Sequence, residues 1–176
     1  MRKTFTTVLI LLLFLSACST KQPMSDAERF IQMRSTLSKI PLVYPMQDAI
    51  ADKHFVNTSI PPFTYNSSTL RSFTDKIANG ITAELIVASY PDEGNVILTL
   101  VQYSGKSFLA LRDTTRDMFG VKIIEEFNYK KWLMFEYGGK KGYYLFNRDV
   151  SKEEFMKSLF SSHSEHQIDN LYVCSE

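Results

Sequence analysis

The first residues in the chain whose types and spacing suggest a chemical reaction are Leu15–Cys18, which read Leu-Ser-Ala-Cys. They close an uncharged run, Phe5–Ala17, that follows the basic residues Arg2 and Lys3. A short basic head, an apolar run too short to cross a bilayer and small residues at its end are typical of a secretory signal peptide. A small residue directly before a cysteine is what bacterial lipoprotein processing requires, because the cysteine thiol receives a diacylglyceryl group and becomes the new N-terminus. We therefore predict a signal peptide over residues 1–17 and lipidation of Cys18.

A lipid on Cys18 predicts where the protein resides. Each buried methylene contributes roughly 0.8 kcal/mol, so two or more acyl chains, such as a diacylglyceryl group with a palmitate, hold a protein stably on a membrane. Residues 18–24 are polar and include a proline, which predicts a short tether. We expect a cell-membrane protein on the extracytoplasmic face. Ser19 would permit sorting to the outer membrane in a Gram-negative host.

The net charge of the chain after removal of the predicted signal peptide limits the kinds of partner that it could bind. Removal of residues 1–17 takes away Arg2 and Lys3 and leaves 18 basic and 19 acidic residues, a net charge of about −1 with histidines neutral. Near-neutrality argues against nucleic acid as a partner and against attachment to anionic lipid by charge alone.

A second group of reactive side chains is Asp113, Arg116 and Asp117, which lie in a polar stretch after an apolar segment. Two carboxylates beside a guanidinium suit binding of a polar ligand, or acid–base chemistry if burial raises the pKa of one carboxyl. The structural alternative, which we favour, is that Asp113 caps the turn and Arg116 pairs with a neighbouring carboxylate.

A third group is His163 and His166, separated by Ser164 and Glu165. Three nitrogen and oxygen ligands are enough for a zinc site with an open position, but no second cluster of ligands accompanies them, and they stand in a serine-rich stretch. They are weak candidates, and we expect neither a metal nor a cofactor. His54 precedes an extended segment and suits a partly exposed residue at the edge of the core. The chain also lacks the Gly-x-Ser-x-Gly and Ser-x-x-Lys arrangements of nucleophilic hydrolases.

The second cysteine of the chain, Cys174, has no intramolecular partner once Cys18 is acylated. It ends Leu-Tyr-Val-Cys, which resembles a strand, so burial as a small hydrophobic residue is favoured over pairing between chains. The aromatic residues Trp132, Phe135, Tyr137, Tyr143, Tyr144 and Phe146 fall on two adjacent strands and suit either an exposed binding face or, more often, core packing.

The elements that must position these residues follow from periodicity and capping signals. Ser25 with Glu28 forms a capping box before a helix over 26–39, and a short helical piece follows over 46–53. Residues 54–58 are predicted to be extended. Asn66 or Ser67 begins a helix that Gly80 ends, and Ser151 with Glu154 begins a last short helix.

Strands are predicted over 81–90, 95–103, 107–112, 122–129, 131–137, 143–147 and 168–174. The segment 95–103 has apolar residues on both faces, which indicates a central strand. Most of these strands are joined by tight turns. We therefore predict one α+β domain over 25–176, with an antiparallel sheet of hairpin-connected strands and helices packed on one side.

Several short motifs occur in a familiar order: Val56-Asn57-Thr58, Ser89-Tyr90 with Glu93-Gly94, Tyr103–Lys106, and Asp113–Asp117 followed by Phe119-Gly120. In this order the chain resembles a family of small lipoproteins, mostly of low-GC Gram-positive bacteria, defined by a domain of unknown function numbered 4362. The resemblance covers about residues 50–120 well and the C-terminal third loosely. It implies a lipoprotein with a compact α+β domain and implies no activity.

Three functions are compatible with these features. The preferred one is a non-enzymatic lipoprotein that binds a protein or small ligand at the cell envelope. The second is an immunity or inhibitor lipoprotein that blocks a toxin or hydrolase, for which exposed carboxylates over 113–117 would be suitable. The third is a hydrolase, which would need a deep pocket containing Asp113, Asp117 and a histidine.

Overall fold

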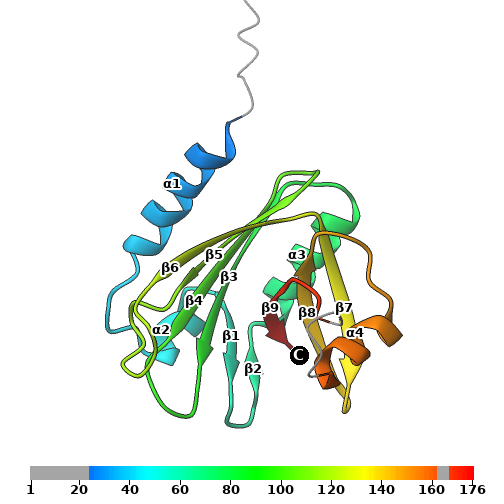
Figure 1. The fold of residues 1–176 in the computed structure, drawn as a ribbon. Helices are drawn as coiled ribbons and strands as arrows, with labels where there is room; N and C mark the ends of the chain where they lie inside the picture. The colour runs from blue at the N-terminus through cyan, green and yellow to red at the C-terminus, as the bar shows by residue number, and fades with distance from the viewer. Residues whose placement is uncertain (1–23, 162–166) are drawn as a thin grey trace, which may run out of the picture.

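The computed structural model describes residues 24–161 and 167–176 (Figure 1). The predicted signal peptide, Cys18 and most of the tether precede the first described residue, and His163 and His166 fall in the second gap. No helix within the described ranges is long and apolar enough to cross a membrane.

The described chain contains helices and strands close to the predicted ranges. The helices are α1 (Asp26–Ser38), α2 (Met46–Ala51), α3 (Ser67–Ala78) and α4 (Lys152–Phe160). The strands are β1 (Phe55–Thr58), β2 (Thr64–Tyr65), β3 (Ala83–Tyr90), β4 (Ile97–Tyr103), β5 (Phe108–Asp113), β6 (Ile124–Tyr129), β7 (Lys131–Tyr137), β8 (Lys140–Phe146) and β9 (Asn170–Ser175). The α+β class is thus confirmed.

The helix ends follow the predicted signals in part. At α1, Ser25 and Glu28 form the full capping box, and Gly80 after α3 has the positive φ of +68° that favours glycine. Ser151 accepts the amide of Glu154 at 3.1 Å, but the Glu154 carboxylate pairs with Arg148 instead of completing the box. Asn66 does not cap α3 with its side chain, which donates to the carbonyl groups of Ile50 and His54.

The main sheet has six strands in the order β2-β1-β3-β4-β5-β6, and it is mixed. Strand β1 pairs with β3 in parallel, with Phe55 opposite Val87 and Thr58 opposite Tyr90, while the other pairs are antiparallel. The fully antiparallel sheet predicted from sequence is therefore wrong. The reason is α3, which lies between β1 and β3 in the chain and makes their connection a crossover, and a crossover joins parallel strands.

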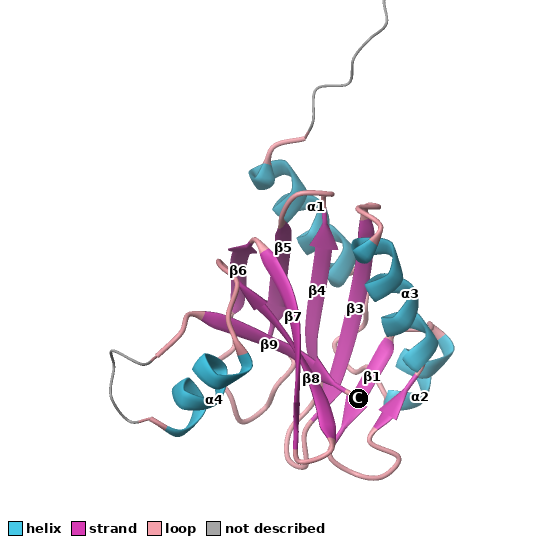
Figure 2. Cartoon of the chain, turned by 90° about the vertical axis from the view of Figure 1, so that its right-hand side faces the viewer, coloured by secondary structure: helices cyan, strands magenta, loops and turns pink. Residues whose placement is uncertain are grey.

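Helices cover both faces of this sheet, so the prediction of helices on one side is also wrong. On one face, Met33 and Leu37 of α1 and Ala49 of α2 pack against Leu98 and Leu109. On the other face, α3 and a second sheet pack against the main sheet in a separate cluster. It includes Leu70, Phe73, Val101, Phe108, Tyr143, Leu145, Leu171 and Val173. Both views show this layering (Figures 1 and 2). Strand β4 contributes to both clusters and is central, as predicted.

The second sheet has three strands in the order β7-β8-β9. Only Lys130 separates β6 from β7, and one residue is too few to close a hairpin, so the chain turns a corner and β7 starts a new sheet. The outer side of this sheet packs on α4 through Phe135, Phe146 and Phe155. A single sheet was expected because the sequence shows two strands in succession but not the geometry of their connection.

Candidate binding site

The three loop residues singled out from the sequence lie near the C-terminal end of α1, and Arg116 contacts that end directly. Its Nη2 donates to the carbonyl oxygens of Leu37 at 3.1 Å and Ile40 at 2.8 Å, and its Nε donates to the carbonyl of Pro41 at 3.1 Å. Leu37 lies in the last turn of α1, and its carbonyl also accepts the amide of Ile40 at 3.1 Å, whereas Ile40 and Pro41 follow the helix. The guanidinium therefore bonds to the backbone where the chain leaves α1. Arg116 is only 6% exposed and joins α1 to the loop after β5.

Asp113 completes this arrangement. Its Oδ2 pairs with Arg116 Nη1, and its Oδ1 accepts from the amide and hydroxyl of Thr115 at 2.9 and 2.6 Å. Asp113 and Arg116 thus use their hydrogen-bonding groups inside the protein, which is the structural alternative described from the sequence. The cavity beside them, of about 360 Å³, is lined by Arg34, Leu37–Leu42, Leu111, Thr115 and Ile124 together with the pair itself, and by no histidine among the described residues.

Asp117 is separate from the pair. Its Oδ1 accepts from the amide of Phe119 at 3.1 Å, and its carboxylate lies against Gly94 and Gly120. A Cβ at Gly94 or Gly120 would come within 2.6 or 2.5 Å of the Asp117 oxygens, so a side chain at either position would force the carboxylate to move. Asp117 therefore connects the β3–β4 turn to the loop after β5.

The remaining sequence candidates divide into two groups. Cys18, His163 and His166 lie outside the described residues, and within the described ranges no three His, Cys, Asp or Glu side chains are grouped to hold a metal. Cys174 is fully buried, and burial raises the pKa of its thiol. Of the six aromatic residues, only Tyr137 is largely exposed, at 58%, so the set mainly fills the core.

His54 is half-buried and belongs to a hydrogen-bonded network. The Tyr44 hydroxyl donates to Asp52 at 2.7 Å and lies 2.9 Å from His54 Nδ1. A carboxylate only accepts, so the single tyrosine proton goes to Asp52 and His54 must donate from Nδ1. The second proton would be taken up at Nε2. Burial lowers the pKa of His54 below its ordinary 6.5, although the nearby Asp52 charge acts in the opposite direction.

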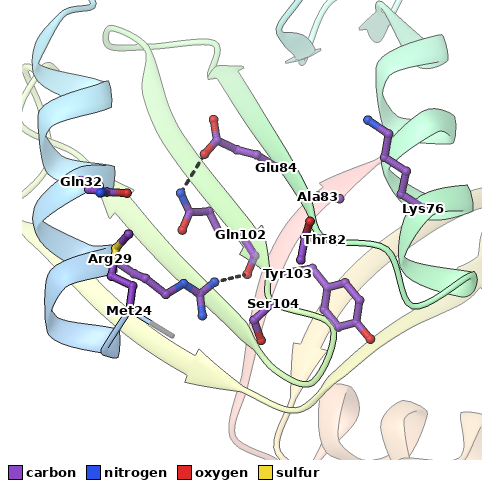
Figure 3. A pocket seen from close by; sticks show the side chains of 10 residues that line it. All are labelled: Met24, Arg29, Gln32, Lys76, Thr82, Ala83, Glu84, Gln102, Tyr103 and Ser104. Atoms are coloured by element: carbon purple, nitrogen blue, oxygen red, sulfur yellow. Dashed lines mark hydrogen bonds between the residues drawn. The ribbon is translucent and has the colours of Figure 1, made fainter. Parts of the chain in front are cut away.

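A surface depression of about 740 Å³ lies between α1, α3 and the ends of β3 and β4 (Figure 3). Its polar groups largely satisfy one another. Arg29 donates to the Gln102 carbonyl at 3.4 Å and lies 3.6 Å from Asp26, while the Gln102 amide donates to Glu84 at 2.8 Å. Met24, the first described residue, also lines it. Ala83 and Tyr103 pair at the end of β3 and β4 that lies beside the start of α1. We call this end of the main sheet the N-terminal edge.

A smaller pocket, of about 310 Å³, lies at the opposite end of the same strands, and we call it the Arg112 pocket. It is lined by Asn57, Thr58, Ser59, Ser89, Tyr90, Pro91, Ile97, Thr99, Arg112, Tyr172 and Val173. Strand register places it: Ser89 pairs with Ile97 at this end, whereas Ala83 pairs with Tyr103 at the N-terminal edge. Sequence reasoning missed Arg112. The sequence does contain a sign of it: Arg112 is a cation at the end of the apolar run Phe-Leu-Ala-Leu, and it shares a strand face with Phe108 and Ala110.

A third pocket, of about 440 Å³, is aromatic and lies between α3 and the start of β7. Phe108, Trp132 and Tyr143 line it, and the rings of Trp132 and Tyr143 stack at 5.5 Å. Trp132 Nε1 is buried without a hydrogen-bond partner among the described residues. The pocket is continuous with the core cluster that joins the two sheets.

Comparison with known protein families finds a match to one family model. The family described as "Domain of unknown function (DUF4362)" matches residues 57–144, half of the chain. The matched range runs from β1 into β8 and includes Arg112, Asp113 and Arg116. No curated protein and no solved structure matches the chain significantly.

Replacing Arg116 tests its role at the end of α1. Arg116→Met removes the cationic partner of the buried Asp113 carboxylate and the guanidinium donors to three carbonyl groups, so we expect a loss of about 3–5 kcal/mol in the free energy of unfolding, measured with urea. The matched control is Arg34→Met. Arg34 pairs with Glu126 at 3.0 Å on the surface, and its loss should cost about 0–1 kcal/mol. Equal small effects for both variants would contradict the structural role of Arg116.

The pKa of His54 predicts a pH dependence of stability. Because burial lowers the folded-state pKa below the unfolded value of 6.5, the unfolded chain takes up this proton first as the pH falls. The contribution of His54 is therefore complete above the unfolded pKa and is lost as the pH decreases towards the folded pKa. His54→Asn keeps a donor for Tyr44 and cannot titrate. Urea unfolding between about pH 7 and 5 should show a shallower slope for this variant; identical slopes would contradict the assignment.

Proposed function

The chain belongs to the DUF4362 family, and from this premise we propose that it is a lipid-anchored protein of the bacterial cell envelope that binds a ligand or protein partner on the extracytoplasmic side. The family brings no activity, so the proposal rests on the anchor and on the geometry of the described residues. The observation that carries it is that Met24, six residues after Cys18, and Arg112, which has no hydrogen-bond or ion-pair partner among the described residues, line pockets at opposite ends of the same strands.

The anchor follows from the Leu-Ser-Ala-Cys motif at residues 15–18. Ser25, the N-cap of α1, is seven residues after Cys18. An extended chain spans at most about 3.5 Å per residue, so the start of α1 stays within roughly 25 Å of an acylated Cys18. The N-terminal edge of the sheet would therefore face the membrane.

Helix α1 is fixed to the rest of the protein, so the anchor would also orient the domain. Met33 and Leu37 are buried against the sheet, Arg29 bonds to the Gln102 carbonyl, and Arg116 bonds to the last carbonyl groups. The β3–β4 turn lies at the other end of the sheet from the start of α1 (Figure 1), and Ser89, Tyr90 and Ile97 beside this turn line the Arg112 pocket. With the N-terminal edge towards the membrane, the turn and the pocket would therefore face away from it. An open polar pocket on the distal end suits a binding module.

The two other functions receive less support. A hydrolase with Asp113 and Asp117 in one site would need these carboxylates to converge, but Asp113 is tied to Arg116 and Asp117 to the amide of Phe119. An immunity or inhibitor protein with exposed carboxylates over 113–117 would need Asp113 at the surface, and it is 4% exposed. We therefore propose binding and not catalysis, with a protein or a small ligand as the partner.

Lipidation has a direct test in cells. Cys18→Ala removes the acceptor thiol, so we expect loss of acyl labelling and loss of the protein from the membrane fraction. The matched control is Cys174→Ala, which removes the other cysteine and should keep both label and membrane partition. Membrane partition of the Cys18→Ala protein equal to that of the unchanged protein, without acyl label, would overturn the anchor.

A further inference from the structure

Arg112 is a cation placed in an unusual position. It lies on β5 beside Thr99 of β4, on the face of the main sheet that the second sheet covers, and it is partly buried. The same face carries Phe108 and Ala110 of β5, which belong to the core between the two sheets. The guanidinium therefore stands where the apolar core ends and the Arg112 pocket begins.

Arg112 makes no hydrogen bond or ion pair with any described residue. The acidic residue directly opposite it on β6 is Glu125, and no ion pair forms between them. Removing a guanidinium from water without a partner is costly, and its planar set of five donors is suited to a carboxylate. An anion in this pocket would gain the interaction that the protein itself does not supply.

The rest of the lining has groups that could orient such an anion. Arg112 is the only charged residue among the lining residues, and none of them is acidic. Asn57 donates to the Tyr172 hydroxyl at 3.4 Å, whereas the hydroxyls of Ser89 and Thr99 have no partner within the described part of the chain. Burial raises the pKa of Tyr172, so its hydroxyl stays neutral near pH 7.

Apolar groups complete the pocket and limit the size of its occupant. Pro91, Ile97 and Val173 line it beside the polar groups. A volume of about 310 Å³ is at the small end for ligand pockets, which are commonly about 300–1,000 Å³. A small ligand with an apolar body and one polar head fits this composition.

We propose that the Arg112 pocket binds the carboxylate of a small organic acid or of a peptide C-terminus, with Arg112 on the carboxylate and the apolar residues against its body. One guanidinium balances one negative charge. A phosphate dianion is commonly held by several cations or by a helix N-terminus, and the lining provides one cation and no helix. This inference rests on the proposed binding function and names its ligand class.

The test uses calorimetric titration of the lipidated, detergent-solubilised protein. The probes are benzoate, its uncharged analogue benzamide, inorganic phosphate, and the tripeptide Ala-Ala-Phe with a free or an amidated C-terminus. We expect saturable binding of benzoate or the free peptide at concentrations up to about 10 mM, and at least about tenfold weaker binding of benzamide and the amidated peptide. The tighter of the two carboxylates identifies the source of the ligand.

Variants separate the pocket from general charge effects. Arg112→Gln should weaken carboxylate binding about tenfold or more, and Thr99→Val, which keeps the side-chain shape, about threefold or more. Arg71→Gln, an exposed arginine on α3, is the matched control and should bind like the unchanged protein. The variants are compared only if their unfolding curves show a folded protein; Thr99→Val decides if Arg112→Gln does not fold.

Four results would overturn the proposal: no carboxylate binding in this range, equal binding of charged and amide probes, tighter binding of phosphate, or unchanged affinity in both pocket variants. None of these results depends on acylation of Cys18. A failure here would therefore leave the anchor intact, and a failure of acyl labelling would leave the pocket chemistry intact.

Discussion

The structure depends on the guanidinium of Arg116, which connects the N-terminal helix to the sheet. It donates to the carbonyl groups of Leu37 in the last turn of α1 and of Ile40 and Pro41 just after the helix, and it pairs with Asp113 at the end of β5. The pair is buried, so neither charge can be removed singly without leaving the other uncompensated in a poorly solvated place. This contact holds the segment after α1 against the loop after β5.

The contact also joins the range that the family model matches to a helix outside that range. Arg116 lies within residues 57–144, which match the family, whereas α1 and α2 precede that range. The N-terminal helices nevertheless cover one whole face of the main sheet through Met33, Leu37 and Ala49. An anchor before α1 would thus orient the family domain, with the N-terminal edge near the membrane and the Arg112 pocket distant from it.

Much of the fold could be predicted from sequence because its local signals are strong. The capping box at Ser25, the glycine after α3 and the apolar residues on both faces of β4 are each signals within a few residues, and the structure confirms them. The topology could not be predicted, because the parallel pairing of β1 with β3 and the corner at Lys130 depend on how distant elements pack.

The candidate sites show the same division. The pairing of Asp113 with Arg116 is a local turn and was recognisable, but the three carbonyl acceptors come from residues 37–41, at and after the end of α1, more than seventy residues earlier. Arg112, the residue next to Asp113, could not be recognised from the sequence. Its significance lies in having no partner among the described residues, and only the folded arrangement of β1, β3, β4, β5 and β9 shows that.

We propose that a lipid on Cys18 holds the N-terminal edge towards the membrane and the Arg112 pocket away from it. The most direct measurement is fluorescence quenching by lipid-borne quenchers in vesicles, with dyes on single introduced cysteines. Lys106→Cys labels the β4–β5 turn at the N-terminal edge, and Asp92→Cys labels the β3–β4 turn beside the pocket; both positions are exposed, while the buried Cys174 thiol should not react. We predict strong quenching at position 106 and little at 92. Equal quenching at the two positions, or stronger quenching at 92, would contradict the account.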